Sequence, residues 1–206
     1  MKLFSHYALL LLGVLSLSAC GGSGVSSTIY PKAFENIEEL RKIHSAILES
    51  MGDQSSKVDE VTFNIDNPAD KGNSGDAYLY IMADMQDPGN PKQLLRQQFH
   101  GELGYWMAPQ EVTVTVHGSD EEKASFRLEE SLFDFAALVS PETLHKVVMA
   151  AFAEGNTEPD EFTYRYVQYV GIDAEGYNVT VKGKLASNDQ IIDDSYDFDF
   201  EGNIIP

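Results

Sequence analysis

Residues 59–66, DEVTFNID, have a counterpart in residues 160–167, DEFTYRYV. A shift of 101 positions lays residues 59–103 over residues 160–204 without a gap, and turn glycines such as Gly75 and Gly176 coincide. Self-similarity at a fixed spacing is typical of duplicated structural units. The sequence therefore predicts a tandem repeat, with coincidental spacing of similar strands as the alternative.

Each unit is expected to open with a helix. Apolar residues recur at helical spacing from Phe34 to Met51 and again from Leu144 to Phe152. Before the second run, Ser140 offers an N-cap side chain and is followed by a proline, which is favoured at the first helical position. Each helix should bury one apolar stripe.

Strands with alternating apolar and polar residues follow both helices. Residues 61–65, 179–185 and 196–200 show this period of two. Alternation means that one face of a sheet packs on the helix while the other is polar. The predicted fold class is α+β: a tandem repeat of a helix packed on an antiparallel three- to four-stranded meander. The first repeat is expected at 32–103 and the second at 140–206.

Residues 104–139 have no counterpart in the repeat and are expected to form a connecting hairpin insertion. Its two strands are predicted at 110–117 and 124–132 because apolar residues alternate there. In fold pattern only, the helix-on-sheet units resemble PepSY-like and beta-lactamase-inhibitor-like periplasmic proteins. Neither family's diagnostic motif is present, so the resemblance implies a fold and no function.

One strand of the first unit, at residues 77–83, is apolar on both sides. The 101-residue register assigns positions 78, 80 and 82 to the core and leaves Leu79 and Ile81 on the other face. A strand that is apolar on both faces is covered on both. Either the insertion packs there, or Leu79 and Ile81 form an interaction surface with Tyr105 and Trp106, residue types favoured at interfaces.

The N-terminal residues have the layout of a secretion signal. Lys2 precedes an apolar run at residues 7–19 that ends in small residues, so residues 1–19 are predicted to be a signal peptide. This run is shorter than the ~20 apolar residues that a membrane-spanning helix needs. The four residues at its end, LSAC at positions 17–20, resemble the lipobox of bacterial lipoproteins.

The lipobox resemblance implies cleavage before Cys20 and a diacylglyceryl group on that cysteine, usually with N-acylation. Several acyl chains would anchor the protein stably to a membrane. Ordinary secretory cleavage after Ala19 is the alternative. Residues 20–31 are rich in Gly and Ser and are expected to form a lipidated, flexible tether. In Gram-negative lipoproteins an aspartate after the cysteine resembles an inner-membrane retention signal, so Gly21 favours the outer membrane, facing the periplasm.

The composition limits the partners. The chain has 14 Lys and Arg against 33 Asp and Glu, and loss of the signal peptide leaves 13 against 33, a formal charge of −20. Such a balance repels nucleic acid and anionic headgroups, so no nucleic-acid partner is expected. An apolar content of 43% with 11% aromatic residues excludes the disordered interpretation of this charge.

Groups that catalysis needs are sparse. Beyond the signal peptide the histidines are His44, His100, His117 and His145, and no two of them have metal-ligand spacing. The GxSxG pattern of a nucleophile elbow is absent from the sequence. Neither catalytic residues nor cofactors are therefore predicted.

One loop carries a weak calcium candidate. Asp66, Asp70, Asn73 and Asp76 supply the oxygen ligands that calcium prefers, but their spacing differs from that of an EF-hand. A solvated acidic surface is the simpler interpretation.

Two functions remain open. The first is a lipid-anchored cell-envelope lipoprotein, joined to the membrane through Cys20, that acts as a non-catalytic interaction module for a protein or envelope component. The second is a periplasmic small-ligand or calcium-binding protein with a cleft between the repeats. A flat apolar sheet face would favour the first function, and a cleft with convergent polar and aromatic groups would favour the second.

Overall fold

The computed structural model describes residues 34, 36–67, 70, 77–100, 105–115, 118–154 and 161–206. The predicted signal peptide, Cys20 and the tether lie outside these residues, and so do Asn73 and Asp76. None of the helices in the described ranges is long and apolar enough to cross a membrane.

Two long helices confirm the helical periodicity of the sequence. Helix α1 (Ile37–Met51) begins after Asn36, whose side chain accepts hydrogen bonds from two backbone amides of the first turn. Helix α4 (Pro141–Glu154) begins after Ser140, whose Oγ accepts from the Thr143 amide. Both residues act as N-caps. The buried stripes consist of Leu40, Ile43, Ala46, Ile47 and Met51 in α1 and Leu144, Val147, Val148 and Ala151 in α4.

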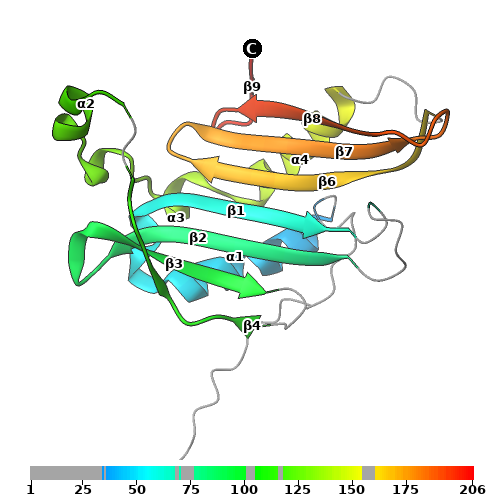
Figure 1. Cartoon of the computed structure of the whole chain (residues 1–206). Coiled ribbons are helices and arrows are strands. Elements are labelled where there is room, and N and C mark those ends of the chain that lie inside the picture. The colour runs from blue at the N-terminus through cyan, green and yellow to red at the C-terminus, as the bar shows by residue number, and fades with distance from the viewer. Residues whose placement is uncertain are drawn as a thin grey trace, which may run out of the picture.

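The strands form one nine-stranded antiparallel sheet in the order β4-β3-β2-β1-β6-β7-β8-β9, with β5 also paired to β3 (Figure 1). Its strands are β1 (Val58–Asp66), β2 (Tyr78–Asp87), β3 (Asn90–His100), β4 (Tyr105–Trp106), β5 (Gln110–Val112), β6 (Phe162–Asp173), β7 (Gly176–Leu185), β8 (Ile191–Phe198) and β9 (Ile204–Ile205). The predicted α+β class with antiparallel strands is confirmed.

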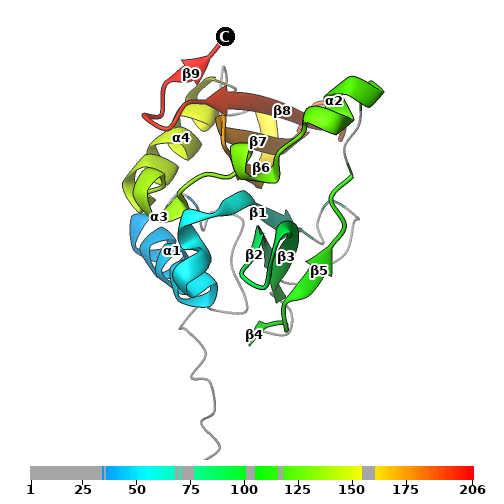
Figure 2. The same ribbon diagram turned by 90° about the vertical axis from the view of Figure 1, so that its left-hand side faces the viewer.

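The two predicted units share one sheet and one core. Strand β1 pairs with β6 at four positions, from Val61↔Ile172 to Asn64↔Tyr169, and we call this pairing the seam. Helices α1 and α4 lie on the same face of the sheet (Figure 2). One hydrophobic cluster runs from α1 through the central strands to Phe198 in β8. A helix followed by three antiparallel strands therefore occurs twice, around a single core.

The ungapped 101-residue register does not hold in the strands. Phe63 pairs with Ile81 on the face that the helices cover. Its predicted equivalent, Tyr164, pairs with Lys184 and donates a hydrogen bond to Asp70 on the other face, which we call the open face. Because side chains alternate along a strand, a one-residue slip moves the whole apolar set to the opposite face.

The insertion at 104–139 is not a hairpin. After β5 it forms helix α2 (Asp120–Ser125), the short 3-10 helix η4 (Leu128–Glu130) and helix α3 (Phe135–Leu138). The strand predicted at 124–132 is wrong, and Glu130 stands where the alternation would need an apolar residue. In Figure 2, α2 lies on the open-face side of the sheet and α3 lies beside α1. Another 3-10 helix, η2 (Gly52–Ser56), follows α1.

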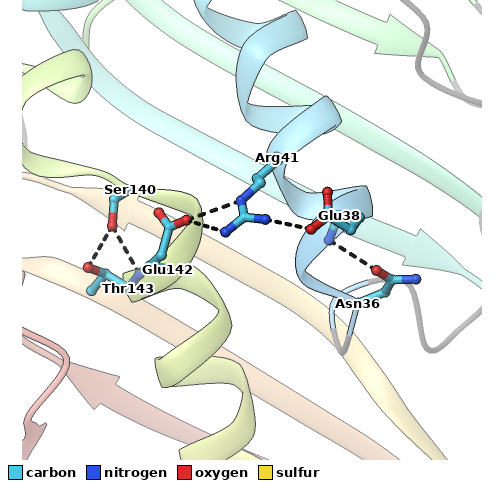
Figure 3. A network of polar contacts seen from close by, with 6 residues as sticks. All are labelled: Asn36, Glu38, Arg41, Ser140, Glu142 and Thr143. Carbon is cyan, nitrogen blue, oxygen red and sulfur yellow. Dashed lines mark hydrogen bonds and ion pairs between the residues drawn. The ribbon is translucent and has the colours of Figure 1, made fainter.

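Polar contacts connect the two long helices (Figure 3). Arg41 in α1 donates from Nε and Nη2 to Oε1 of Glu142 in α4, at 3.2 and 3.0 Å. His44 lies deeper, with Nε2 2.9 Å from the Val139 carbonyl oxygen and its ring stacked on Phe135. Exposed ion pairs contribute little stability, so the apolar cluster holds the layers together.

Candidate functional site

The predicted interaction surface is not a single surface. Leu79 and Ile81 are 0% exposed and belong to the hydrophobic cluster beneath the helices. This part of the prediction is wrong because the true register differs by one residue from the one inferred by repeat matching. Trp106 is half-buried against Phe99 on the same covered face, whereas Tyr105 pairs with His100 on the open face and is 53% exposed.

The open face is rich in tyrosine. Directly paired residues of neighbouring strands point to the same face. The pairs Asn64↔Tyr80 and Asn64↔Tyr169 therefore place tyrosines from both halves on either side of the seam. By the same pairing the open-face tyrosines are Tyr78, Tyr80, Tyr105, Tyr164, Tyr166 and Tyr169. Tyrosine combines an apolar ring with a polar hydroxyl, which suits a binding surface.

A pocket of about 600 Å³ hollows the open face at the seam. This volume is typical of small-molecule sites. Both halves of the molecule contribute to it. The lining residues are Thr62, Asn64, Ile65, Asp66, Asn67, Asp70, Tyr80, Met82, Gln98, Gln168, Lys182 and Ile191.

Thr62 lies at the floor of the pocket. It is only 5% exposed, and its Oγ1 has no hydrogen-bond partner. A buried hydroxyl without a partner costs about 1–3 kcal/mol. Thr62 pairs with Gly171 across the seam, and the Tyr169 ring lies over that glycine, where a Cβ would be 2.7 Å from the Tyr169 hydroxyl oxygen. The glycine therefore makes room for the tyrosine beside the floor.

Gln168 reaches the pocket because of an irregularity in β6. Val167 pairs with Val181 and Tyr169 pairs with Thr180, so Gln168 is an extra residue in this strand. Such a β-bulge redirects side chains and is common beside functional sites. Its position depends on how β6 pairs with β7, which the alternation of the sequence does not reveal.

An ion pair forms one wall of the pocket. Asp70 accepts hydrogen bonds from the hydroxyls of Tyr164 and Tyr166 and lies 2.8 Å from Lys182 Nζ. Burial alone would raise the pKa of Asp70, but these donors outweigh it and hold the pKa below its ordinary value. Burial and the hydrogen bond to Asp70 raise the pKa of Tyr164 to about 12, so its hydroxyl stays protonated and donates.

The same wall argues against the calcium candidate. Both carboxylate oxygens of Asp70 already accept hydrogen bonds, and the Lys182 ammonium would repel a cation there. Within the described residues, no three His, Cys, Asp or Glu side chains are grouped so that they could hold a metal ion. Asn73 and Asp76, the other two proposed ligands, lie outside those residues.

A row of acidic residues borders the pocket toward the β1 start. Burial and the charge of Asp84 raise the pKa of Glu60, while Asp84 itself binds Arg96 through both carboxylate oxygens at 2.8 and 2.7 Å. Asp59, whose pKa is raised mainly by burial, accepts a hydrogen bond from Ser131 Oγ at 2.9 Å. This end of the open face is therefore negatively charged.

Sequence reasoning missed most of the site. In the sequence Thr62 and Asn64 fit only the polar positions of an alternating strand, and no local pattern connects Lys182 with Asp70. Lys182 pairs with Asp193 of the last long strand and also contacts Asp70, which comes from the other half of the chain. One feature of the sequence could have indicated the pocket. On β1, the hydroxyl of Thr62 and the amide of Asn64 alternate with core residues, and this strand directly precedes the loop that carries Asp66 and Asp70.

Comparisons with known proteins do not assign this chain to a family. No protein-family model matches the chain, and no curated protein matches it. A solved structure of a provisionally assigned lipoprotein from Clostridium difficile 630 is similar, with a TM-score of 0.39 and 8% identity, covering 79% of this chain and 90% of that chain. Likeness of this degree carries no information about the site.

Proposed function

We propose that this protein is a lipid-anchored, non-catalytic lipoprotein of the cell envelope that binds a small organic molecule in the open-face pocket. The observation that carries the proposal is the buried, unpartnered Thr62 hydroxyl at the floor of this pocket. Binding sites are concave and combine apolar walls with a few convergent polar groups. A ligand hydroxyl or amide would supply the hydrogen bond that Thr62 lacks.

The anchor is proposed from the sequence. Lipid on Cys20 and a flexible tether at 20–31 would hold the domain beside a membrane, with the outer membrane facing the periplasm as the favoured location. Incorporation of labelled palmitate into the protein, and its loss in Cys20→Ser, tests this step. Labelling of Cys20→Ser at the wild-type level would exclude it.

Binding without catalysis is supported by the chemistry of the pocket. Its described lining contains neither His nor Cys, and its Asp70 carboxylate is held by three donors rather than positioned as a free base. A general base needs access to the proton that it removes. The formal charge of −20 on the mature chain supports a ligand other than nucleic acid.

A small ligand is favoured over a protein partner because polar and aromatic groups converge at the seam. The predicted protein-binding surface included Leu79 and Ile81, but both residues are buried in the core. We also infer that the two halves arose by duplication, supported by their shared order of a helix and three antiparallel strands.

A fragment screen by saturation-transfer NMR tests the proposal on the mature, detergent-solubilised chain. Asn64 and Ser195 lie in the same open-face row and are both exposed, but only Asn64 lines the pocket. Asn64→Trp should block fragments that bind the wild type, while Ser195→Trp should keep them. Fragments that bind all three proteins equally would place the site elsewhere, and an absence of bound fragments would contradict the proposal.

A further inference from the structure

Many of the polar groups that line the pocket are uncharged. Besides Thr62 they include four carboxamides, those of Asn64, Asn67, Gln98 and Gln168. A carboxamide offers two N–H donors and a carbonyl acceptor, and a threonine hydroxyl can both donate and accept. These groups match a ligand whose own polar groups also donate and accept. Hydroxyl groups have this property, whereas carboxylates only accept and ammonium groups only donate.

The charges that line the pocket are already paired. Lys182 Nζ lies 2.8 Å from Asp70, whose side chain is 11% exposed. Asp66 also has an interaction partner. An anionic ligand would need Lys182 to leave Asp70, and a buried charge that loses its partner is costly. The neighbouring carboxylates of Glu60 and Asp59 add repulsion against an anion.

Apolar surface accompanies these amides. Tyr80, Met82 and Ile191 line the pocket. The Tyr80 ring meets His100 edge-on, with ring centroids 4.8 Å apart and planes at 81°, which fixes its orientation. A purely apolar ligand would cover this surface but would leave the Thr62 hydroxyl unpaired. A ligand with hydroxyl groups around an apolar C–H face satisfies both parts of the pocket.

We propose that the pocket binds a neutral saccharide of one to three rings, an inference that rests on the proposed small-molecule function of this site. Thr62 Oγ1 and the carboxamides of Gln98 and Gln168 exchange hydrogen bonds with sugar hydroxyls. Tyr80 and Met82 contact the C–H face of a ring. The Asp70–Lys182 pair closes one side of the pocket and excludes charged analogues.

Calorimetric titration of the mature chain in a sugar-free amine-oxide detergent tests this inference. The neutral probes are maltotriose, cellotriose and N,N′-diacetylchitobiose, and the charged comparators are glucose 6-phosphate and spermidine. We expect at least one neutral saccharide to bind and neither charged compound to compete with it. Spermidine is included because the acidic row is the feature that would attract a cation.

Two near-isosteric variants separate binding from folding. Thr62→Val and Gln98→Leu should each weaken the bound saccharide about five- to tenfold, since each removes a hydrogen-bonding group. Thr62→Val should at the same time raise the melting temperature of the free protein, because it removes a buried hydroxyl without a partner. Thr180→Val is the control: Thr180 lies on the open face beyond the pocket lining and should leave the affinity unchanged.

The outcomes are distinct. If spermidine or glucose 6-phosphate binds and the saccharides do not, the saccharide inference is wrong, and the fragment screen decides separately whether the pocket is a small-molecule site. If a saccharide binds equally well to Thr62→Val, Gln98→Leu and the wild type, it binds outside the pocket and the inference fails. If none of the five probes binds, the saccharide inference is overturned, and the fragment screen decides separately whether the pocket binds any small molecule.

Discussion

The two faces of the sheet differ completely although the same strands build them. One row across the seam faces the helices, and each of its central residues is at most 2% exposed. That row contains Phe99, Ile81, Phe63, Val170 and Val179. The next row, one residue along each strand, contains His100, Tyr80, Asn64, Tyr169 and Thr180.

The difference shows how stability and binding can be separated by one residue of register. The covered row supplies the apolar burial that holds the fold, and the open row supplies Tyr80 and Asn64 to the pocket. Substitutions on the first row should therefore act on folding, and substitutions on the second row should act on binding.

The largest effect is expected on the covered row. Ile81→Ala should lower the free energy of unfolding by about 2–5 kcal/mol, because it leaves a cavity in the core. Met82→Ala, on the half-buried open-face side of the same strand, should cost less than about 1.5 kcal/mol. Urea denaturation measures both values. Equal losses would mean that the two faces contribute alike to stability.

A smaller loss of stability is expected when the hydrogen bonds and the ion pair of Asp70 on the open face are weakened. Asp70→Asn should lower stability by about 1–3 kcal/mol, since it weakens hydrogen bonds to two tyrosines and leaves Lys182 without its partner. Asp189→Asn is the matched control, because the Lys184–Asp189 pair has the same 2.8 Å distance but its Asp189 is 79% exposed. The control should be near the wild type.

Acid provides a second test of Asp70. The pKa of Asp70 is lower in the folded protein, so its stabilising contribution is complete above the ordinary value of 3.8 and is lost as the pH falls through the folded value. The stability difference between wild type and Asp70→Asn should therefore shrink below about pH 4. A difference that stays constant into strong acid would contradict the ionic role of this carboxylate.

His44, which contacts Phe135 and Val139 where α1 meets α3, should give a weaker pH effect. Burial lowers its pKa, although the hydrogen bond to Val139 acts in the opposite direction. Its contribution is therefore complete above 6.5 and is lost as the pH falls through the folded pKa. After allowance for solvent screening, the loss should stay under about 1 kcal/mol. Unfolding curves between pH 7 and 5 should show it in wild type and not in His44→Gln.

The smallest effect is expected at the surface link between the helices. Arg41→Ala removes the contacts to Glu38 and Glu142, which are exposed to solvent (Figure 3). Melting temperatures at low and high salt should differ little between variant and wild type, because solvent and ions screen such pairs. A large loss on substitution would show that this link, rather than the shared core, holds the helices together.

Sequence patterns identified the elements that repeat locally. Helices α1 and α4 and strands β1, β7 and β8 follow periods that the sequence shows directly. The sequence did not show which face of β2 packs on the helices. Leu79 and Ile81 alternate there with Tyr80 and Met82, which are also partly apolar. Tyrosine suits a core or a binding face, so composition alone could not choose between them.

The site was less predictable because it depends on contacts between distant residues. Asp70 is 94 and 96 residues from the two tyrosines that hold it. The bulge at Gln168 depends on the pairing of β6 with β7. Local alternation contains neither fact, and the repeat matching introduced a one-residue error that exchanged the two faces.

The seam also has a consequence for the order of folding. It joins β1 and β6 at four positions between residues more than 100 apart, whereas each hairpin joins near neighbours over a longer stretch. Closing a long loop costs entropy, so distant pairings form late. We expect the two hairpin systems to form first and the seam last, so that the pocket exists only in the fully assembled protein. A ligand that binds only the assembled pocket would then stabilise the seam and oppose the separation of the two halves.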